Sequence, residues 1–155
     1  MKILMPVLSR FARHGGVTQF IGNFLSAVRM SKSNVAVYDH ECEITNKLIE
    51  VNAFSRWAGL KRKCWLLVCV ITYPYKLTKF DHVFLNPSLG KSSMAREMFY
   101  AKHCVKRNKK FSIFFHGWNW DFAEYLDTNI ILRTKYIKYI NEASNVFVLG
   151  VAFKS

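Results

Sequence analysis

The sequence predicts an α/β fold, with a Rossmann-like, mostly parallel sheet and helices on both of its faces. Three short apolar runs, residues 3–8, 83–85 and 113–115, each end in small, polar or imidazole-bearing residues. Each run has the composition of a buried strand that opens into a loop. Helical patterns lie between these runs, and such alternation favours parallel pairing. Because the carboxyl ends of parallel strands face one crevice, we expect the loops to converge on one site.

The first half of the chain predicts a strand, a helix and a second strand. Apolar residues recur at helical spacing through residues 17–28, and residues 34–38 are typical of a strand. Residues 44–51 fit either a strand or part of a helix. Residues 53–71 form a helical pattern, which we expect residues 73–75 (Tyr-Pro-Tyr) to break, because the residue before a proline is pushed out of the α region.

The second half repeats the alternation of strands and helices. The expected elements are, in order, a strand at residues 80–85, a helix from a cap at Ser92 or Ser93 to about Lys106, a strand at 111–115, a helix at about 129–143 and a strand at 145–149. The apolar face of the first of these helices consists of Met94, Met98, Ala101 and Val105.

Composition indicates one globular domain over residues 1–155. The chain is 51% hydrophobic and 21% charged, which is too apolar for a disordered protein. Its length suits one ordinary core and leaves no room for a second domain. The formal net charge of +13 favours anionic partners: nucleic acid, phosphorylated substrates or an anionic membrane surface.

Targeting and cysteine patterns favour a cytoplasmic protein. The first apolar run is interrupted by Pro6 and Ser9 and is too short for a secretory signal. The apolar stretch at residues 65–75 is well below the roughly 20 residues that cross a bilayer. The cysteines lack the spacing of a zinc site or of a disulfide framework, so we expect reduced core thiols at Cys42, Cys64, Cys69 and Cys104.

A glycine pair precedes the first predicted helix and gives a candidate phosphate site. Gly15 and Gly16 allow close approach of an anion to the backbone, and the helix start provides free N–H groups. Arg10, Arg13 and His14 add positive charge. An equally weighted interpretation is a tight turn from strand to helix, because the full dinucleotide fingerprint with three glycines is absent.

The loop after residues 113–115 has the composition of a sugar site. His116 can orient a hydroxyl or exchange a proton. Tryptophan faces, such as that of Trp118, pack on the apolar face of a pyranose, and Asn119 and Asp121 can hydrogen-bond to its hydroxyls. The alternative is a structural loop, with its tryptophans under the domain and His116 bonded to backbone carbonyls.

Three further segments have weaker signals. Residues 86–93 lead from a strand to a helix, so Asn86 and Ser88 can contact an acceptor or simply form a cap and turn. The basic residues 106–110 are expected to form a solvated turn at the opposite end of the sheet. Basic residues interleaved with tryptophans at 56–65 fit a surface helix or an anionic lipid surface. Residues 39–42 are too close together to hold one metal ion, so no metal is expected.

Four segments together resemble the amino-terminal half of a group 1 (family four) retaining glycosyltransferase of the GT-B fold. They are KILMP with GGV (residues 2–6 and 15–17), FDHVFLNPS (80–88), FFHG (114–117) and ASNVFVL with FK (143–149 and 153–154). The resemblance covers nearly the whole chain. It implies a Rossmann-like domain that binds the acceptor of a transferase which moves a sugar from a nucleotide-sugar to a glycan or glycolipid.

The resemblance also implies roles for individual residues. Gly15 and Gly16 would approach the donor diphosphate, and His116 would be catalytic, beside the transferred sugar and the acceptor hydroxyl. The nucleotide-sugar is a co-substrate, and no cofactor or metal is implied. Many relatives build lipopolysaccharide or other polysaccharides at the inner membrane face, which implies a cytoplasmic, peripheral location. The donor-binding domain is not among these residues, so the chain alone is expected to be truncated and inactive. The alternative is a non-catalytic basic module that binds nucleic acid or a phosphorylated ligand; for the transferase, nucleic acid is not an expected partner.

Overall fold

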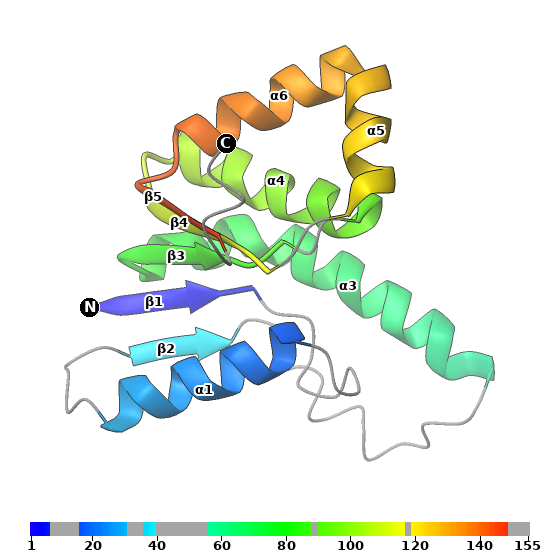
Figure 1. Ribbon diagram of the computed structural model, residues 1–155. Helices are drawn as coiled ribbons and strands as arrows, with labels where there is room; N and C mark the ends of the chain where they lie inside the picture. Colours follow the sequence, from blue (N-terminus) through cyan, green and yellow to red (C-terminus); the bar gives the residue numbers. More distant parts are fainter. Residues whose placement is uncertain (7–15, 31–35, 40–55, 88–89, 117–118, 149–155) are drawn as a thin grey trace. The chain divides into compact units, whose positions relative to one another are not determined.

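The chain forms two compact units, residues 1–80 (unit 1) and residues 81–155 (unit 2), in a computed structural model (Figure 1). Every described pairing between strands within a unit is parallel, and helices lie between the strands in sequence. The predicted α/β class is therefore confirmed, and the arrangement is consistent with a Rossmann-like fold. The structure describes residues 1–6, 16–30, 36–39, 56–87, 90–116 and 119–148.

Unit 1 contains a parallel strand pair and two helices. Strand β1 (Lys2–Met5) pairs with β2 (Ala36–Asp39) in the register Lys2↔Ala36 to Met5↔Asp39, with helix α1 (Gly16–Met30) between them in sequence. The last three residues of β1 are buried, as its apolar composition predicts. The helix expected at residues 17–28 is confirmed, and stacking of Phe20 on Phe24, with ring centroids 6.1 Å apart, follows from their spacing of four residues.

Helix α3 (Arg56–Lys76) continues through Pro74, so the prediction that the helix breaks there is wrong. Proline lacks an N–H, but here it lies in the last turns of a 21-residue helix, where only one helical hydrogen bond is lost. Burial of Tyr73 and of Leu77, which begins the 3-10 turn η1 (Leu77–Lys79), stabilises this end of the helix. Residues 44–51 lie outside the described residues.

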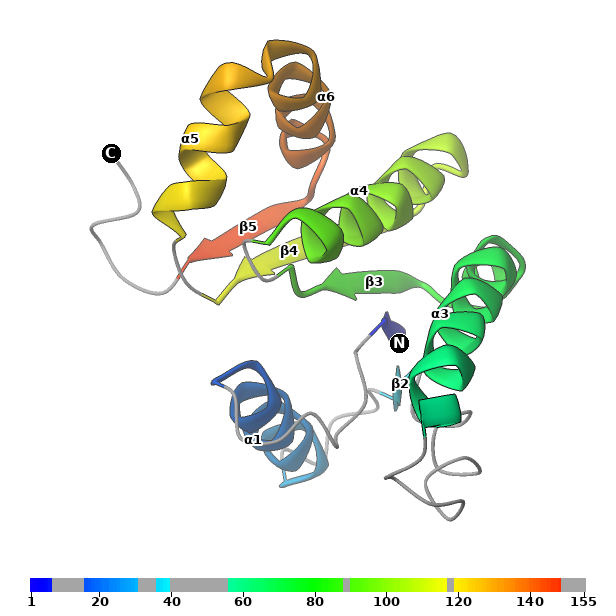
Figure 2. The ribbon, with the colours of Figure 1, turned by 90° about the vertical axis from the view of Figure 1, so that its right-hand side faces the viewer.

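Unit 2 is a three-stranded parallel sheet with helices packed on it. Strand β4 (Lys110–Phe115) pairs with β3 (His82–Leu85) and with β5 (Asn145–Val148). Figure 2 shows helices α4 and α6 on the same side of this sheet. In order along the chain, the helices of unit 2 are α4 (Lys91–Lys106), α5 (Trp120–Thr128) and α6 (Ile130–Asn141).

The core of unit 2 lies between the sheet and helix α4. Alternate strand residues are at most 1% exposed, namely Val83, Leu85, Phe111 and Ile113. Helix α4 packs on β3 and β4, and α6 packs on α4 and α5. Of the predicted apolar face of α4, Met94, Met98 and Ala101 are buried and Val105 is partly exposed. The two-residue period of the strands and the helical spacing of α4 therefore predict this core correctly.

Local details differ from the expected ones. Gly90, not Ser92 or Ser93, is the N-cap of α4, and no side chain caps this end. Helix α5 was not expected; it is stabilised at its start by the Asn119 side chain, which accepts a hydrogen bond from the Phe122 backbone N–H at 3.1 Å.

The cysteines agree with the expected core thiols only in part. Cys69 and Cys104 are buried and form no disulfide, as expected, but the prediction is wrong for Cys64, which is exposed. Cys42 lies outside the described residues. Among the described residues, every helix is too short or too polar to span a bilayer.

The turn from α4 to β4 gives a test of the backbone. Asn108 has φ 50°, in the left-handed region that disfavours side chains with a Cβ. We expect Asn108→Ala to lower the free energy of unfolding by about 1 kcal/mol and Asn108→Gly to leave it within about 0.5 kcal/mol. Urea unfolding followed by circular dichroism measures both. Equal stability of the two variants would contradict the left-handed turn.

Candidate functional site

A hydrogen bond joins the carboxyl ends of two neighbouring strands in unit 2. Asn86 comes directly after β3, and His116 comes directly after β4. The Nε2 atom of His116 lies 3.1 Å from Oδ1 of Asn86. The parallel register pairs Leu85 with Ile113, which brings the two strand ends to the same edge of the sheet. The convergence predicted from sequence is therefore confirmed for these two residues.

The hydrogen bonds of Asn86 determine which nitrogen of His116 carries the proton. The Asn86 side-chain NH₂ donates to the Phe84 carbonyl oxygen at 3.3 Å, so its Oδ1 atom faces the imidazole as an acceptor. An amide oxygen only accepts, and His116 Nε2 must therefore carry the hydrogen and donate it. In the neutral ring, the Nδ1 atom then holds the lone pair. His116 is a neutral acceptor whose orientation Asn86 fixes.

Burial keeps the His116 ring uncharged. It lowers the pKa of this imidazole from its ordinary value of 6.5 to about 4. The Phe114 ring contributes to this apolar environment, since its centroid lies 4.5 Å from that of the imidazole. Asn86 is itself only 5% exposed. At neutral pH the ring is therefore suited to accepting a hydrogen bond and poorly suited to taking up a proton.

A buried carboxylate lies in the same unit and was not singled out from the sequence. Glu97 is fully buried on α4, and Arg96 donates to its Oε1 atom from Nε at 3.2 Å and from Nη2 at 3.0 Å. The other carboxylate oxygen, Oε2, is buried and has no hydrogen-bond partner among the described residues. Burial raises the pKa of Glu97, while Arg96 acts in the opposite direction. The available signal in the sequence was an acid within the apolar face of α4, next to Met98.

Two residues predicted from the sequence to bind an acceptor, Asn119 and Asp121, lie at the start of helix α5, with Trp120 between them. The Asn119 side-chain oxygen caps the helix through Phe122, which gives it a structural role. Asp121 is exposed in the first turn, where a carboxylate stabilises the helix dipole. Trp120 is 78% exposed, so it is not packed under the domain. An exposed indole at this helix start is suited to stacking on an apolar ligand face.

Five of the other residues predicted from the sequence to form the site are not described by the structure. Arg13, His14, Gly15, Ser88 and Trp118 lie outside the described residues. Gly16 is the first residue of α1 in unit 1, and its predicted approach to a phosphate stays a prediction. Among the described residues, no group of three or more histidine, cysteine or acidic side chains is placed to hold a metal ion.

A second histidine, His82, lies towards the amino ends of the strands and forms a hydrogen bond that connects neighbouring strands. His82 Nε2 lies 2.9 Å from the Ser112 hydroxyl, to which the Asn145 side chain also donates at 3.4 Å. Ser112 is only 3% exposed, so its hydroxyl is not presented to a substrate. Burial and the nearby Lys110 lower the pKa of His82. This cluster joins β3, β4 and β5 at one end of the sheet.

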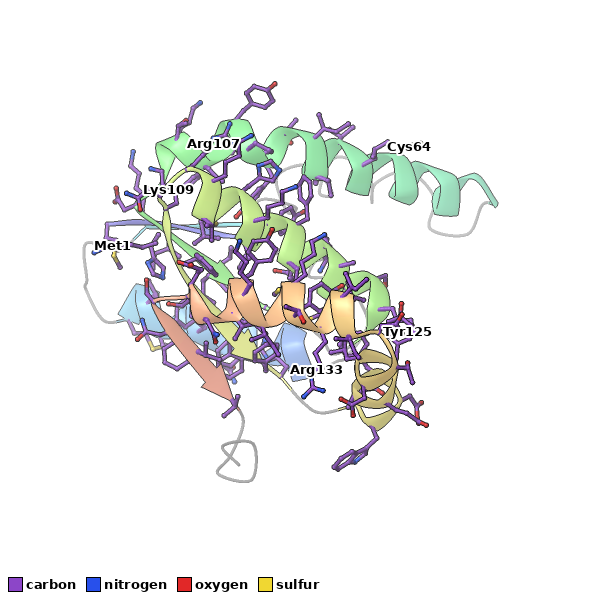
Figure 3. The ribbon with its side chains drawn as sticks, turned by 90° about the horizontal axis from the view of Figure 1, so that it is seen from above. Met1, Cys64, Arg107, Lys109, Tyr125 and Arg133 are labelled. Atoms are coloured by element: carbon purple, nitrogen blue, oxygen red, sulfur yellow. The ribbon has the colours of Figure 1, made fainter. Side chains whose placement is uncertain are left out.

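Basic residues gather at the same amino end, around the α4–β4 connection. Figure 3 shows Arg107 and Lys109 there, at the opposite end of unit 2 from Tyr125. Burial, together with three neighbouring cations, lowers the pKa of His103, which reports a positive local potential. Acidic residues at this end include Asp81 before β3 and Glu142 after α6. We call the following residues the basic end: Lys102, Lys106, Arg107, Lys109 and Lys110.

The chain matches no protein-family model and no curated protein.

The depressed pKa of His116 predicts a pH dependence of stability. In the unfolded chain the ring takes up a proton near pH 6.5, whereas in the folded chain it does so only near pH 4. Protons therefore favour unfolding over this window, and stability is lost as the pH falls. We expect wild type to lose about 2 kcal/mol more than His116→Gln between about pH 7 and pH 4, allowing for solvent screening at a partly exposed ring.

Urea unfolding at the two pH values measures this difference. His82, His103 and Glu97 are present in both proteins, so their contributions cancel. The glutamine introduced by His116→Gln retains an amide donor for Asn86 without titrating. Equal losses in the two proteins would show that folding leaves the pKa of His116 unchanged, contrary to the burial of its ring.

Proposed function

We propose that this chain is the acceptor-side domain of a retaining glycosyltransferase that moves a sugar from a nucleotide-sugar to a glycan or glycolipid. One observation carries the proposal: the neutral His116, oriented by Asn86, at the carboxyl ends of adjacent parallel strands. Ligands of open α/β sheets bind at this edge. The motifs that resemble the transferase family include both residues, in FDHVFLNPS and FFHG.

In this proposal His116 is the catalytic residue and acts by orientation. Its imidazole contacts a sugar hydroxyl, while Nε2–H remains bonded to Asn86. A group with a pKa of about 4 is a weak general base at neutral pH, so proton removal is left to another group. A neutral acceptor also suits an uncharged sugar better than an anion.

The remaining sequence candidates complete the proposed site. Gly15 and Gly16 would approach the donor diphosphate, and the acceptor would contact Arg13, His14 and Ser88. Trp118, Asn119 and Asp121 would also contact the acceptor. The partner domain that binds the nucleotide-sugar is implied by the resemblance, as is a peripheral location at the cytoplasmic face of a membrane. No cofactor other than the nucleotide-sugar co-substrate is proposed.

Sugar transfer tests the proposal. In the full-length protein, we expect His116→Ala to lower kcat/KM about ten- to hundredfold, because one hydrogen bond to the reacting sugar is lost. Transfer of radiolabelled sugar from nucleotide-sugars to a glycolipid extract gives the rate. His103→Ala is the matched control, because His103 lies towards the basic end of α4 and its ring contacts that of Phe99. Equal rates for wild type and His116→Ala would remove His116 from the site.

The basic end favours a second candidate function, a non-catalytic module that binds nucleic acid or a phosphorylated ligand. Its five cations lie at the end of α4, on the connection to β4 and at the start of β4. Three of them, Lys102, Lys106 and Arg107, help to lower the pKa of His103. A polyanion gains affinity by releasing counterions from such a surface. Cations in the last turn of α4 also stabilise helix carbonyl groups, so the cluster has a structural reason as well.

The two candidate functions use opposite ends of unit 2, and variants can therefore separate them. For polyanion binding, we expect Lys106→Gln/Lys109→Gln/Lys110→Gln to weaken binding of labelled single-stranded DNA at least about tenfold and to reduce its salt dependence. Fluorescence anisotropy at several salt concentrations measures both. His116→Ala is the control and should bind DNA like wild type. Binding that depends on His116 and not on these lysines would contradict the second candidate.

A further inference from the structure

Helix α3 has two apolar faces, and only one of them is buried. Cys69 and Tyr73, one turn apart, lie in the core. A second row of large side chains on the same helix is between 38% and 74% exposed. We call this row the apolar stripe, and it consists of Leu67, Val68, Ile71 and Tyr75. Their spacing keeps them on one face for about two turns. The outer face of a surface helix is ordinarily polar, so the stripe calls for a partner.

The side chains around the stripe are suited to leaving water. Cys64, which Figure 3 labels on α3, is exposed one turn before Leu67 and lies on the same face. The Thr72 hydroxyl donates to the Val68 carbonyl oxygen at 2.8 Å, so its hydrogen bond is already made within the helix. Tyr75, at the carboxyl end of the stripe, combines an apolar ring with a hydroxyl, as aromatic residues at the boundary between lipid and water do.

The charge around the stripe has one sign. Residues 56–80 include six cations and no acidic residue. Lys76 and Lys79 come directly after the stripe, and Lys79 is exposed. An anionic lipid surface attracts such a segment, and a basic helix with an apolar face is the kind that lies in the plane of the interface. A second copy of the chain would bring two helices of like charge together, which disfavours it as the occupant.

We propose that the apolar stripe of α3 docks on an anionic lipid surface, with the helix axis along the plane of the membrane. Leu67, Val68 and Ile71 enter the boundary between headgroups and acyl chains, and Lys76 and Lys79 bind lipid phosphates. Among the residues that the structure describes, no helix can span a bilayer, and this mode of contact needs none. The proposal deepens the proposed function, on which it rests for the side of the membrane, whereas the contact itself needs no sugar.

Vesicle flotation with the full 155-residue chain tests the proposal. Wild type should bind vesicles of phosphatidylcholine and phosphatidylglycerol at least about tenfold more tightly than vesicles of phosphatidylcholine alone, and added salt should reduce this difference. Leu67→Gln/Ile71→Gln should weaken binding to the anionic vesicles at least about tenfold, because less apolar area enters the lipid. The matched control is Ile130→Gln/Ile131→Gln, which alters two residues of α6 that are 70% and 89% exposed, and it should bind like wild type.

Lys76→Gln/Lys79→Gln separates the contribution of charge from that of the apolar contact. This variant should weaken binding to the anionic vesicles at least about fivefold and leave binding to phosphatidylcholine vesicles unchanged. An unchanged affinity for the anionic vesicles would overturn the proposal, because the two lysines would then not face the lipid.

Fluorescence decides the question even if Leu67→Gln/Ile71→Gln does not fold. Brominated acyl chains should quench the indole introduced by Ile71→Trp, whereas the indole introduced by Ile130→Trp should stay unquenched. The opposite pattern overturns the proposal, as does equal vesicle binding by wild type and a folded Leu67→Gln/Ile71→Gln. Sedimentation equilibrium without lipid also tests it, because a dimer that depends on Leu67 and Ile71 would make a second copy the occupant. These measurements use no nucleotide-sugar, so a failure of the proposed transfer leaves their result separate.

Discussion

The hydrogen bond from His116 to Asn86 depends on the parallel pairing of β3 with β4, and the chemistry of the site depends on that bond. Parallel strands end at the same edge, so two residues that are 30 positions apart in sequence have side-chain atoms 3.1 Å apart. Because the Asn86 amide is also bonded to Phe84, its oxygen has only one orientation. A rotatable asparagine would accept either form of the imidazole, whereas this one selects a single form.

Sequence patterns predicted the strands, most helices and the two residues of this pair, because these depend on local periodicity and on where a run ends. They did not predict the bond itself, which needs the register between β3 and β4. Pro74 lies inside α3 because burial of Tyr73 and Leu77 outweighs a local preference. Glu97 was missed for a related reason: its burial depends on how α4 packs on β3 and β4, which a local sequence pattern does not record.

The formal net charge of +13 indicated an anionic partner, but unit 2 separates charge from the candidate site. Two described cations of α4 already have partners: Arg96 bonds to Glu97, and the Lys91 ammonium lies 3.8 Å from the centre of the Tyr125 ring. A positive potential is felt instead at the basic end, where cations help to lower the pKa of His103. Net charge alone therefore gives no information about the ligand of the strand-end site.

The charge state of His116 decides which kind of chemistry the strand ends support. An imidazole with an ordinary pKa exchanges protons near neutral pH, and acid-base catalysis would be its expected role. With a pKa of about 4, fewer than about one ring in a hundred is protonated at pH 7, so the ring cannot serve as an acid there. The ring is neutral, fixed in orientation and held in a partly apolar environment, where a hydrogen bond to a neutral hydroxyl is stronger than in water. Such a ring favours hydroxyl groups that approach it from one direction. That direction is fixed by Asn86, whose side chain is held by the Phe84 carbonyl oxygen.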